Sequence, residues 1–179
     1  MSNHVITEDH STVQFNPLFL PIALIACGVV GGVLAFISYN YFSLIVIFPV
    51  IMGVVAGTMA RQVVKQTDGG NSIKTILLAI VLALITYGVY RYAEYYLTFE
   101  EFGNRIKAIA TFPNYLNWSA EQGISITRAT QSDSSGLELT GQGVWILWGV
   151  EILIMLFIAF SSSRNNDDDQ AETVEEEAV

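Results

Sequence analysis

The stretch ILLAIVLALITYGVYRYAEYY, residues 76–96, decides the class of this protein. Its first half is almost purely aliphatic, and its second half places five tyrosines around one arginine and one glutamate. A helix needs about 20 apolar residues to cross the ~30 Å hydrocarbon core of a bilayer. Aromatic and charged residues mark the level at which such a helix meets the membrane surface. The stretch therefore predicts a transmembrane helix that ends at an interface.

Other apolar runs lie on both sides of this helix. Between His10 and Arg61 the chain has no Asp, Glu, Lys or Arg, and one helix of that length would far exceed the bilayer thickness. The polar and aromatic residues SYNYFS, 38–43, predict the turn between two spans, and VWILWGVEILIMLFIAF, 144–160, predicts another span. We expect an all-α membrane protein, a bundle of four transmembrane helices, with spans near 18–37, 44–63, 73–97 and 144–160.

The composition excludes several classes of protein. Hydrophobic residues make up 52% of the chain and charged residues only 14%, which is too apolar for a soluble domain of this size. Seven of the seventeen acidic residues lie in the ending RNNDDDQAETVEEEAV, so we expect a disordered acidic tail over 161–179 and a polar arm over 1–16. The chain has no Lys/Arg-rich stretch, so nucleic acid binding is not expected. The single Cys27 excludes an intramolecular disulfide.

Basic residues near the span ends predict the orientation. Arg61, Lys65, Lys74 and Arg164 flank spans on the side of the termini, whereas Arg105 and Lys107 flank them on the other side. The positive-inside rule then predicts cytoplasmic termini in a plasma or inner membrane. With this threading, all the tyrosines and tryptophans fall at or beyond the opposite face. The residues predicted to form this aromatic interface are Tyr87, Tyr90, Tyr92, Tyr95, Tyr96, Trp118, Trp145 and Trp148.

The segment 98–143 predicts a small extracytoplasmic α+β cap between the third and fourth spans. Residues 98–112 read as an amphipathic helix that ends before Pro113, and a second helix-like run stops at Gly123. The stretches ISITR and LELTGQG alternate as the strands of a hairpin do. We expect Phe102, Ile106 and Trp118 to meet the stripe of Tyr87, Arg91 and Tyr95, while Tyr92 and Tyr96 face lipid headgroups.

Glu151 is the most informative single residue. An ionised carboxylate inside a span costs about 2.5 to 3.5 kcal/mol near the helix centre, so Glu151 is expected to face the bundle with a partner. Arg91 is the basic residue at a comparable depth, which predicts an intramembrane pair between Arg91 and Glu151. Glu94, three residues from Arg91 on the same helix, is a competing partner.

Two pairs of glycines carry the spacing that lets membrane helices approach closely. Gly28 and Gly32 lie in the first span, and Gly53 and Gly57 lie in the second. We expect both pairs to pack the first two spans against each other.

The sequence contains no arrangement typical of an enzyme, a cofactor site or a metal site. His4 and His10 on the polar arm are spaced too loosely to predict a metal centre. Two functions are compatible with these observations. One is a non-enzymatic membrane protein that acts through protein partners or a homo-oligomer in the lipid bilayer. The other is a small transporter or channel component with an ion or proton site at Glu151 and Arg91.

Overall fold

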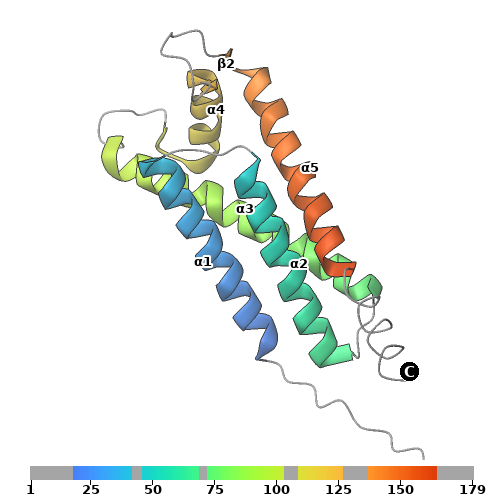
Figure 1. Ribbon diagram of the computed structural model, residues 1–179. Coiled ribbons are helices and arrows are strands. Elements are labelled where there is room, and N and C mark those ends of the chain that lie inside the picture. The colour runs from blue at the N-terminus through green and yellow to red at the C-terminus, as the bar shows by residue number, and fades with distance from the viewer. Residues whose placement is uncertain (1–17, 42–45, 69–71, 103–108, 127–136, 165–179) are drawn as a thin grey trace, which may run out of the picture.

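A computed structural model describes residues 18–41, 46–68, 72–102, 109–126 and 137–164 (Figure 1). The predicted polar arm lies outside these ranges, as does the acidic tail beyond Arg164. The elements, in chain order, are α1 Phe19–Asn40, α2 Ile47–Asp68, α3 Ser72–Phe102, α4 Phe112–Gln122, β1 Ile124–Ile126, β2 Leu137–Leu139 and α5 Gln142–Arg164.

The prediction of four apolar helices is confirmed. By length and composition, α1, α2, α3 and α5 are each able to cross a bilayer, and together with α4 they make the described chain predominantly helical. Each helix has a boundary that differs from the predicted one, and α2 ends at Asp68 and α3 at Phe102 instead of at 63 and 97. Helix α1 continues through Ser38 to Asn40, where a turn was expected, and α5 continues past residue 160 to Arg164. No proline or glycine interrupts either helix at those points, so nothing stops them.

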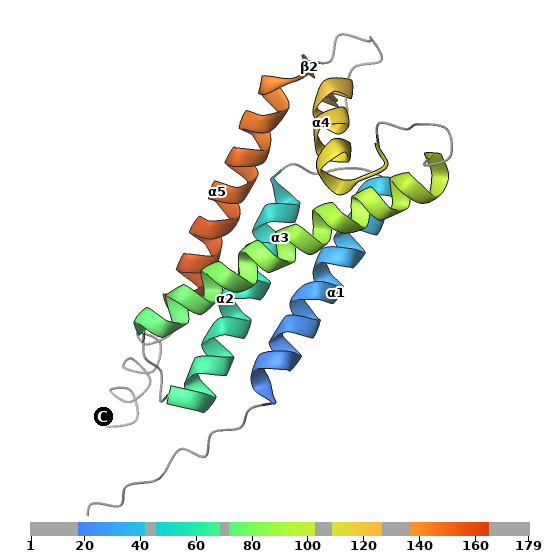
Figure 2. The ribbon, with the colours of Figure 1, turned by 180° about the vertical axis from the view of Figure 1, so that it is seen from behind.

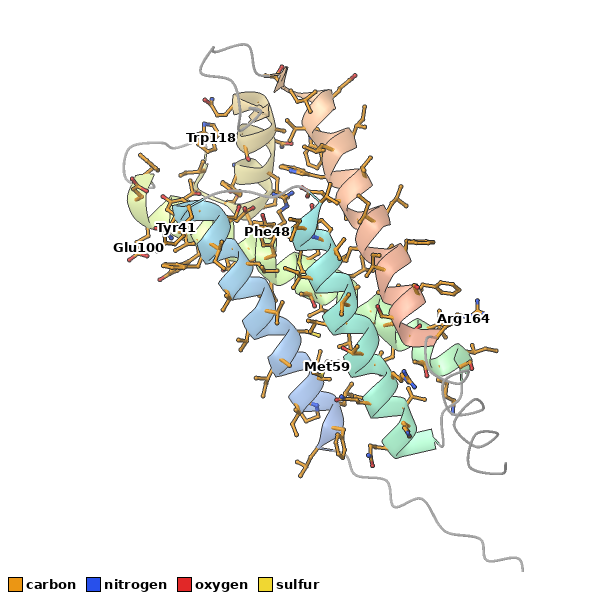
Figure 3. All side chains as sticks on the ribbon, in the orientation of Figure 1. Tyr41, Phe48, Met59, Glu100, Trp118 and Arg164 are labelled. Carbon is orange, nitrogen blue, oxygen red and sulfur yellow. The ribbon has the colours of Figure 1, made fainter. Side chains whose placement is uncertain are left out.

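The long helices form two layers. Helices α1, α2 and α5 lie side by side, with α2 in the middle, and α3 runs obliquely across all three (Figures 1 and 2). Helix α1 begins and α5 ends at one end of the molecule, whereas α4 lies at the opposite end, which is called the α4 end below (Figure 1). Figure 3 shows Tyr41, Phe48, Glu100 and Trp118 toward the α4 end and Arg164 near the other.

Helix α3 is the longest element. Its 31 residues span roughly 46 Å at 1.5 Å per residue, well beyond a ~30 Å hydrocarbon core. The sequence contains no helix breaker between Tyr96 and Phe102, so the helix continues past the tyrosine cluster. The oblique crossing and the extra turns carry its last residues toward α4 (Figure 2). The amphipathic helix predicted for 98–112 is therefore wrong at its start, because Thr98–Phe102 belong to α3.

Helix α4 begins and ends where its sequence dictates. Pro113 stands in the first turn of α4 instead of ending a preceding helix, because a first-turn residue needs no intrahelical N–H bond. Gly123 ends the helix with φ of 82°, a conformation that favours glycine, and a Cβ there would lie 2.7 Å from the Leu139 carbonyl oxygen. The expected stop at Gly123 is thus confirmed.

The predicted α+β cap is not supported. The described part of segment 98–143 contributes α4 and one antiparallel pair of strands, β1 and β2, with three residues in each strand. A pair this short is marginal without further packing, so it does not make a sheet layer. Its role is local: it brings Leu139 onto the small cluster of Ala120, Val144 and Trp148, where α4 meets α5.

The glycines of α2 pack against α5, not against α1 as predicted. A Cβ on Gly53 would lie 2.6 Å from the Met155 carbonyl oxygen, and one on Gly57 would lie 2.6 Å from that of Ala159. Four residues further along α2, from Gly53 to Gly57, the contact has also moved four residues along α5, from Met155 to Ala159. The two helices therefore run parallel. The two backbones approach closely along this line.

The glycine pair of α1 is also placed differently from the prediction. Within the described residues, a Cβ on Gly28 or Gly32 would meet nothing within 4 Å. The close contact of α1 is made by Gly31 instead, where a Cβ would lie 2.7 Å from the Thr86 carbonyl oxygen of α3. The glycine spacing correctly predicts that α1 packs closely against another helix, but the face that does so carries Gly31 instead of Gly28 and Gly32.

Alanine substitutions at matched glycines test this packing. Gly57→Ala is expected to lower the free energy of unfolding by about 1–3 kcal/mol, because its methyl group must push the backbones of α2 and α5 apart. Gly28→Ala in α1 is the control and is expected to leave stability unchanged or slightly raised. Thermal unfolding in mild detergent measures both variants. Equal losses would show that the close α2–α5 contact is wrong.

Candidate functional site

Arg91 lies at the centre of a buried polar network between α3, α5 and α1. Its Nη2 is 2.6 Å from Glu151 Oε2, and its Nη1 is 2.9 Å from Glu94 Oε2. The three side chains are between 9% and 14% exposed. The structure thus brings Arg91 together with both residues proposed as its partners, and the two carboxylates share the guanidinium instead of competing for it.

Hydroxyl groups extend the network on both sides of Arg91. The Tyr87 hydroxyl donates to Glu151 Oε2 at 3.0 Å and accepts from both Nε and Nη2 of Arg91. On the other side, Tyr90 donates to Ser38 Oγ at 3.2 Å, and Ser38 donates to Glu94 Oε1 at 3.0 Å. Charge-assisted hydrogen bonds of this kind are stronger than neutral ones. The network therefore ties the end of α1 to α3 and α5.

Aromatic rings surround the guanidinium of Arg91. Its Cζ lies 4.6 Å from the ring centre of Trp148, 5.1 Å from that of Tyr87 and 5.2 Å from that of Tyr90. Such contacts stabilise a cation that has lost its hydration shell. Trp148 also packs on Ala120 of α4, and its indole Nε1 is buried without a hydrogen-bond partner among the described residues. Trp148 therefore links the network to α4.

The network lies toward the α4 end of the spans. The register that pairs Gly53 with Met155, continued by one turn, places Glu151 opposite the first turn of α2. Ser38 stands two residues before the end of α1, and Tyr90 makes an edge-to-face contact with Phe48, the second residue of α2. Glu151 is therefore nearer to the α4 end of the bundle than its place in the apolar run 144–160 indicates.

A second group of aromatic side chains joins α3 to α4. Tyr95 contacts both Phe112 and Tyr115 of α4, with ring centres 5.7 and 5.4 Å apart. Burial raises the pKa of the Tyr115 phenol, and the nearby charge of Glu94 adds to this effect. Tyr39 of α1 also donates a hydrogen bond to Glu101 of α3. The Tyr95 contacts hold α4 against the end of α3, and the Tyr39–Glu101 bond joins that end to α1.

Other aromatic residues of the prediction have the following neighbours. Tyr92 contacts Phe112 of α4 and is 55% exposed, close to the 58% of Tyr96. Trp118 contacts Tyr115 within α4. Phe102 is the last residue of α3, and Ile106 lies outside the described residues. Trp145 packs edge-to-face on Trp148 of its own helix.

No protein-family model, curated protein or solved structure matches this chain. The site is therefore interpreted from its own chemistry. Within the described ranges, no three His, Cys, Asp or Glu side chains are grouped to hold a metal ion. Cys27 is buried within α1 among apolar side chains. The chemical character of the network is that of an ionic and hydrogen-bonded junction between helices.

The sequence does not predict Ser38, Tyr90 or Trp148 as members of the network. Ser38 stands in the polar stretch SYNYFS, which predicts a turn, and Tyr90 and Trp148 are predicted as part of the aromatic interface. Trp148 stands three residues before Glu151 and therefore lies on the same face of the helix, so this spacing could have predicted that it joins the network. Ser38 offered no such signal, because its partner Glu94 is 56 residues away in the chain.

Glutamine substitutions test the strength of the network. Arg91→Gln is expected to lower the free energy of unfolding most, by about 3–5 kcal/mol, because it leaves buried carboxylates without a counter-charge. Glu151→Gln keeps the Arg91–Glu94 pair and is expected to lose only about 1–2 kcal/mol. The Arg91→Gln/Glu151→Gln double variant should lose less than the sum of the two. Strictly additive losses in detergent unfolding would show that the pair is not coupled.

Alanine substitutions on α3 test how α4 is held. Tyr95→Ala removes the ring that meets Phe112 and Tyr115, and it is expected to expose residues 109–126 to protease while the spans stay inserted. Tyr96→Ala, the adjacent and exposed position, is the matched control and should change cleavage little. Identical cleavage rates in the two variants, measured by limited proteolysis in lipid, would contradict this role for Tyr95.

Proposed function

We propose that this chain is a non-enzymatic, multi-pass integral membrane protein that acts as an interaction module or as a small subunit of a membrane assembly. The observation that carries the proposal is the attachment of α4. Trp148 connects the ionic network to α4 on one side, and Tyr95 holds α4 on the other. A short helix of 11 residues is thereby fixed in a defined orientation beyond the spans. Isolated helices of this length are marginal in water.

The fixed helix presents a polar face. Asn114, Asn117 and Glu121 are exposed and recur at the spacing of one helical face, whereas Tyr115 and Ala120 are buried against the rest of the protein. A rigid polar surface outside the membrane suits binding of another protein, because little ordering is required when the partner arrives. The partner surface is either a second copy of this chain or a different membrane protein.

The proposed orientation follows the charges. Helix α2 ends, α3 begins and α5 ends at the end of the molecule opposite α4 (Figure 1). The last turns of α2 carry Arg61 and Lys65, the first turn of α3 carries Lys74, and α5 ends at Arg164. The positive-inside rule supports placing this end, and with it both termini, in the cytoplasm of a plasma or inner membrane. Helix α4 then lies on the extracytoplasmic side.

The second candidate is a small transporter or channel component that uses Glu151 and Arg91. The excess of carboxylates over cations in the network favours it, since intramembrane acids serve in proton and ion pathways. The bonds of Arg91 argue against this candidate. Its guanidinium is bonded to both carboxylates and to Tyr87, so these groups are already paired with one another. Ion or proton flux through reconstituted protein that Glu151→Gln abolishes, with the fold intact, would establish this candidate instead.

A cysteine placed on α4 tests both the orientation and the interaction. In a Cys27→Ala background, the Asn117→Cys variant is expected to react in intact cells with a membrane-impermeant crosslinker and to form one adduct of discrete mass. Replacing Asn114 and Glu121 by alanine should abolish the adduct but not the labelling. Lys65→Cys is the matched control and should react only after the cells are opened. If only Lys65→Cys were labelled in intact cells, the orientation would be the opposite of the proposed one. Labelling of Asn117→Cys without an adduct would contradict the interaction function.

A further inference from the structure

The charges of the network do not balance. Arg91 supplies one positive charge, whereas Glu94 and Glu151, at 2.9 and 2.6 Å from its guanidinium, supply two negative charges when both are ionised. All three side chains are withdrawn from solvent within the fold. One guanidinium neutralises one carboxylate, so the fully ionised network carries an excess negative charge.

Within the described residues, no second cation faces the network. Helix α1 presents Ser38, α2 presents Phe48, and α5 presents Trp148 beside Glu151. Helix α3 contributes the phenols of Tyr87 and Tyr90, and α4 places the Tyr115 phenol near Glu94. Phenols ordinarily titrate near pH 10, so at neutral pH they supply hydrogen bonds but no charge. The excess charge is not removed by any of these neighbours.

The position of the network makes an excess charge costly. Glu151 and Arg164 are thirteen residues apart on α5, which is about 20 Å along a helix. A hydrocarbon core of ~30 Å that starts at the level of Arg164 therefore ends about 10 Å beyond the network. An unpaired carboxylate at this depth is disfavoured strongly enough that such groups take up a proton instead.

The hydrogen bonds indicate where that proton is held. Both oxygens of Glu94 already accept hydrogen bonds, one from Arg91 and the other from Ser38. At Glu151, the two donors Arg91 and Tyr87 both reach Oε2. A proton on Glu151 Oε1 therefore disturbs none of these bonds. We propose that the Glu94–Glu151 pair is a proton-binding site that holds one proton at neutral pH, on Oε1 of Glu151.

Although one atom carries the proton, both carboxyl groups determine whether it is bound. Both carboxyl groups interact with the same guanidinium, so removal of either one leaves the other as the only carboxylate of the pair beside Arg91 and favours its ionised form. This coupling gives the proposal a distinctive signature: substituting the unprotonated member of the pair also releases the proton. The site does not depend on the proposed interaction function, because it rests on the charges, the depth and the hydrogen bonds of the network.

Infrared spectroscopy of the full-length protein in lipid vesicles at neutral pH tests the site. The wild-type protein is expected to show the C=O stretch of one protonated carboxyl group, which shifts when glutamate is labelled with carbon-13 at its carboxyl carbon. Glu151→Gln and Glu94→Gln are each expected to abolish this band. Arg91→Gln is expected to make it about twice as large, because both acids then lack a counter-charge. Glu121→Gln, at an exposed position on α4, should leave it unchanged.

Each outcome decides the proposal. A wild-type spectrum without the glutamic acid band overturns it, and this result requires no variant to fold. A band that survives in both Glu94→Gln and Glu151→Gln also overturns it, because the proton then resides elsewhere in the chain. If only one of these variants folds, loss of the band in that variant supports the pair, and its persistence there overturns the proposal. Crosslinking through α4 is measured separately, so failure of either proposal leaves the other standing.

Discussion

One buried guanidinium organises the described part of this protein. Arg91 extends from the middle of the oblique helix α3 and is bonded to an acid on its own helix and to another on α5, and a serine joins α1 to the same network. Inside a bilayer there is no hydrophobic force between helices, so packing and interhelical polar contacts determine how they associate. The long span α3 crosses its three neighbours at an angle, and this cluster fixes the point at which they meet.

The same cation also couples the membrane part to the part outside it. The Trp148 ring contacts the guanidinium and packs on α4 as well, so one side chain belongs to both layers. Helix α4 is attached to α5 through Trp148 and to α3 through Tyr92 and Tyr95. A disturbance of the ionic network is therefore transmitted to the surface by direct packing.

Much of this architecture could be predicted from the sequence, because apolar length determines which segments can cross a bilayer. The meeting of Arg91 with Glu151 could be anticipated for a similar reason, since a charge in a span requires a partner. Helix faces and boundaries could not be predicted equally well. Gly28 and Gly32 have the same spacing as Gly53 and Gly57, yet among the described residues a Cβ would meet another helix only at the second pair, because the neighbours of a helix are set by the tertiary arrangement. The sequence predicts a helix that ends before Pro113, although proline is equally suited to a first turn.

The parallel contact between α2 and α5 has a consequence for biosynthesis. Gly57 and the alanine it meets, Ala159, are separated by about 100 residues of chain, which a ribosome needs on the order of ten seconds to synthesise. During that interval the glycine face of α2 is already in the membrane while its partner helix does not yet exist. Lipid, or a chaperone of the insertion machinery, must cover this face until the last span arrives. The order of synthesis thus makes α5 the helix that completes the fold.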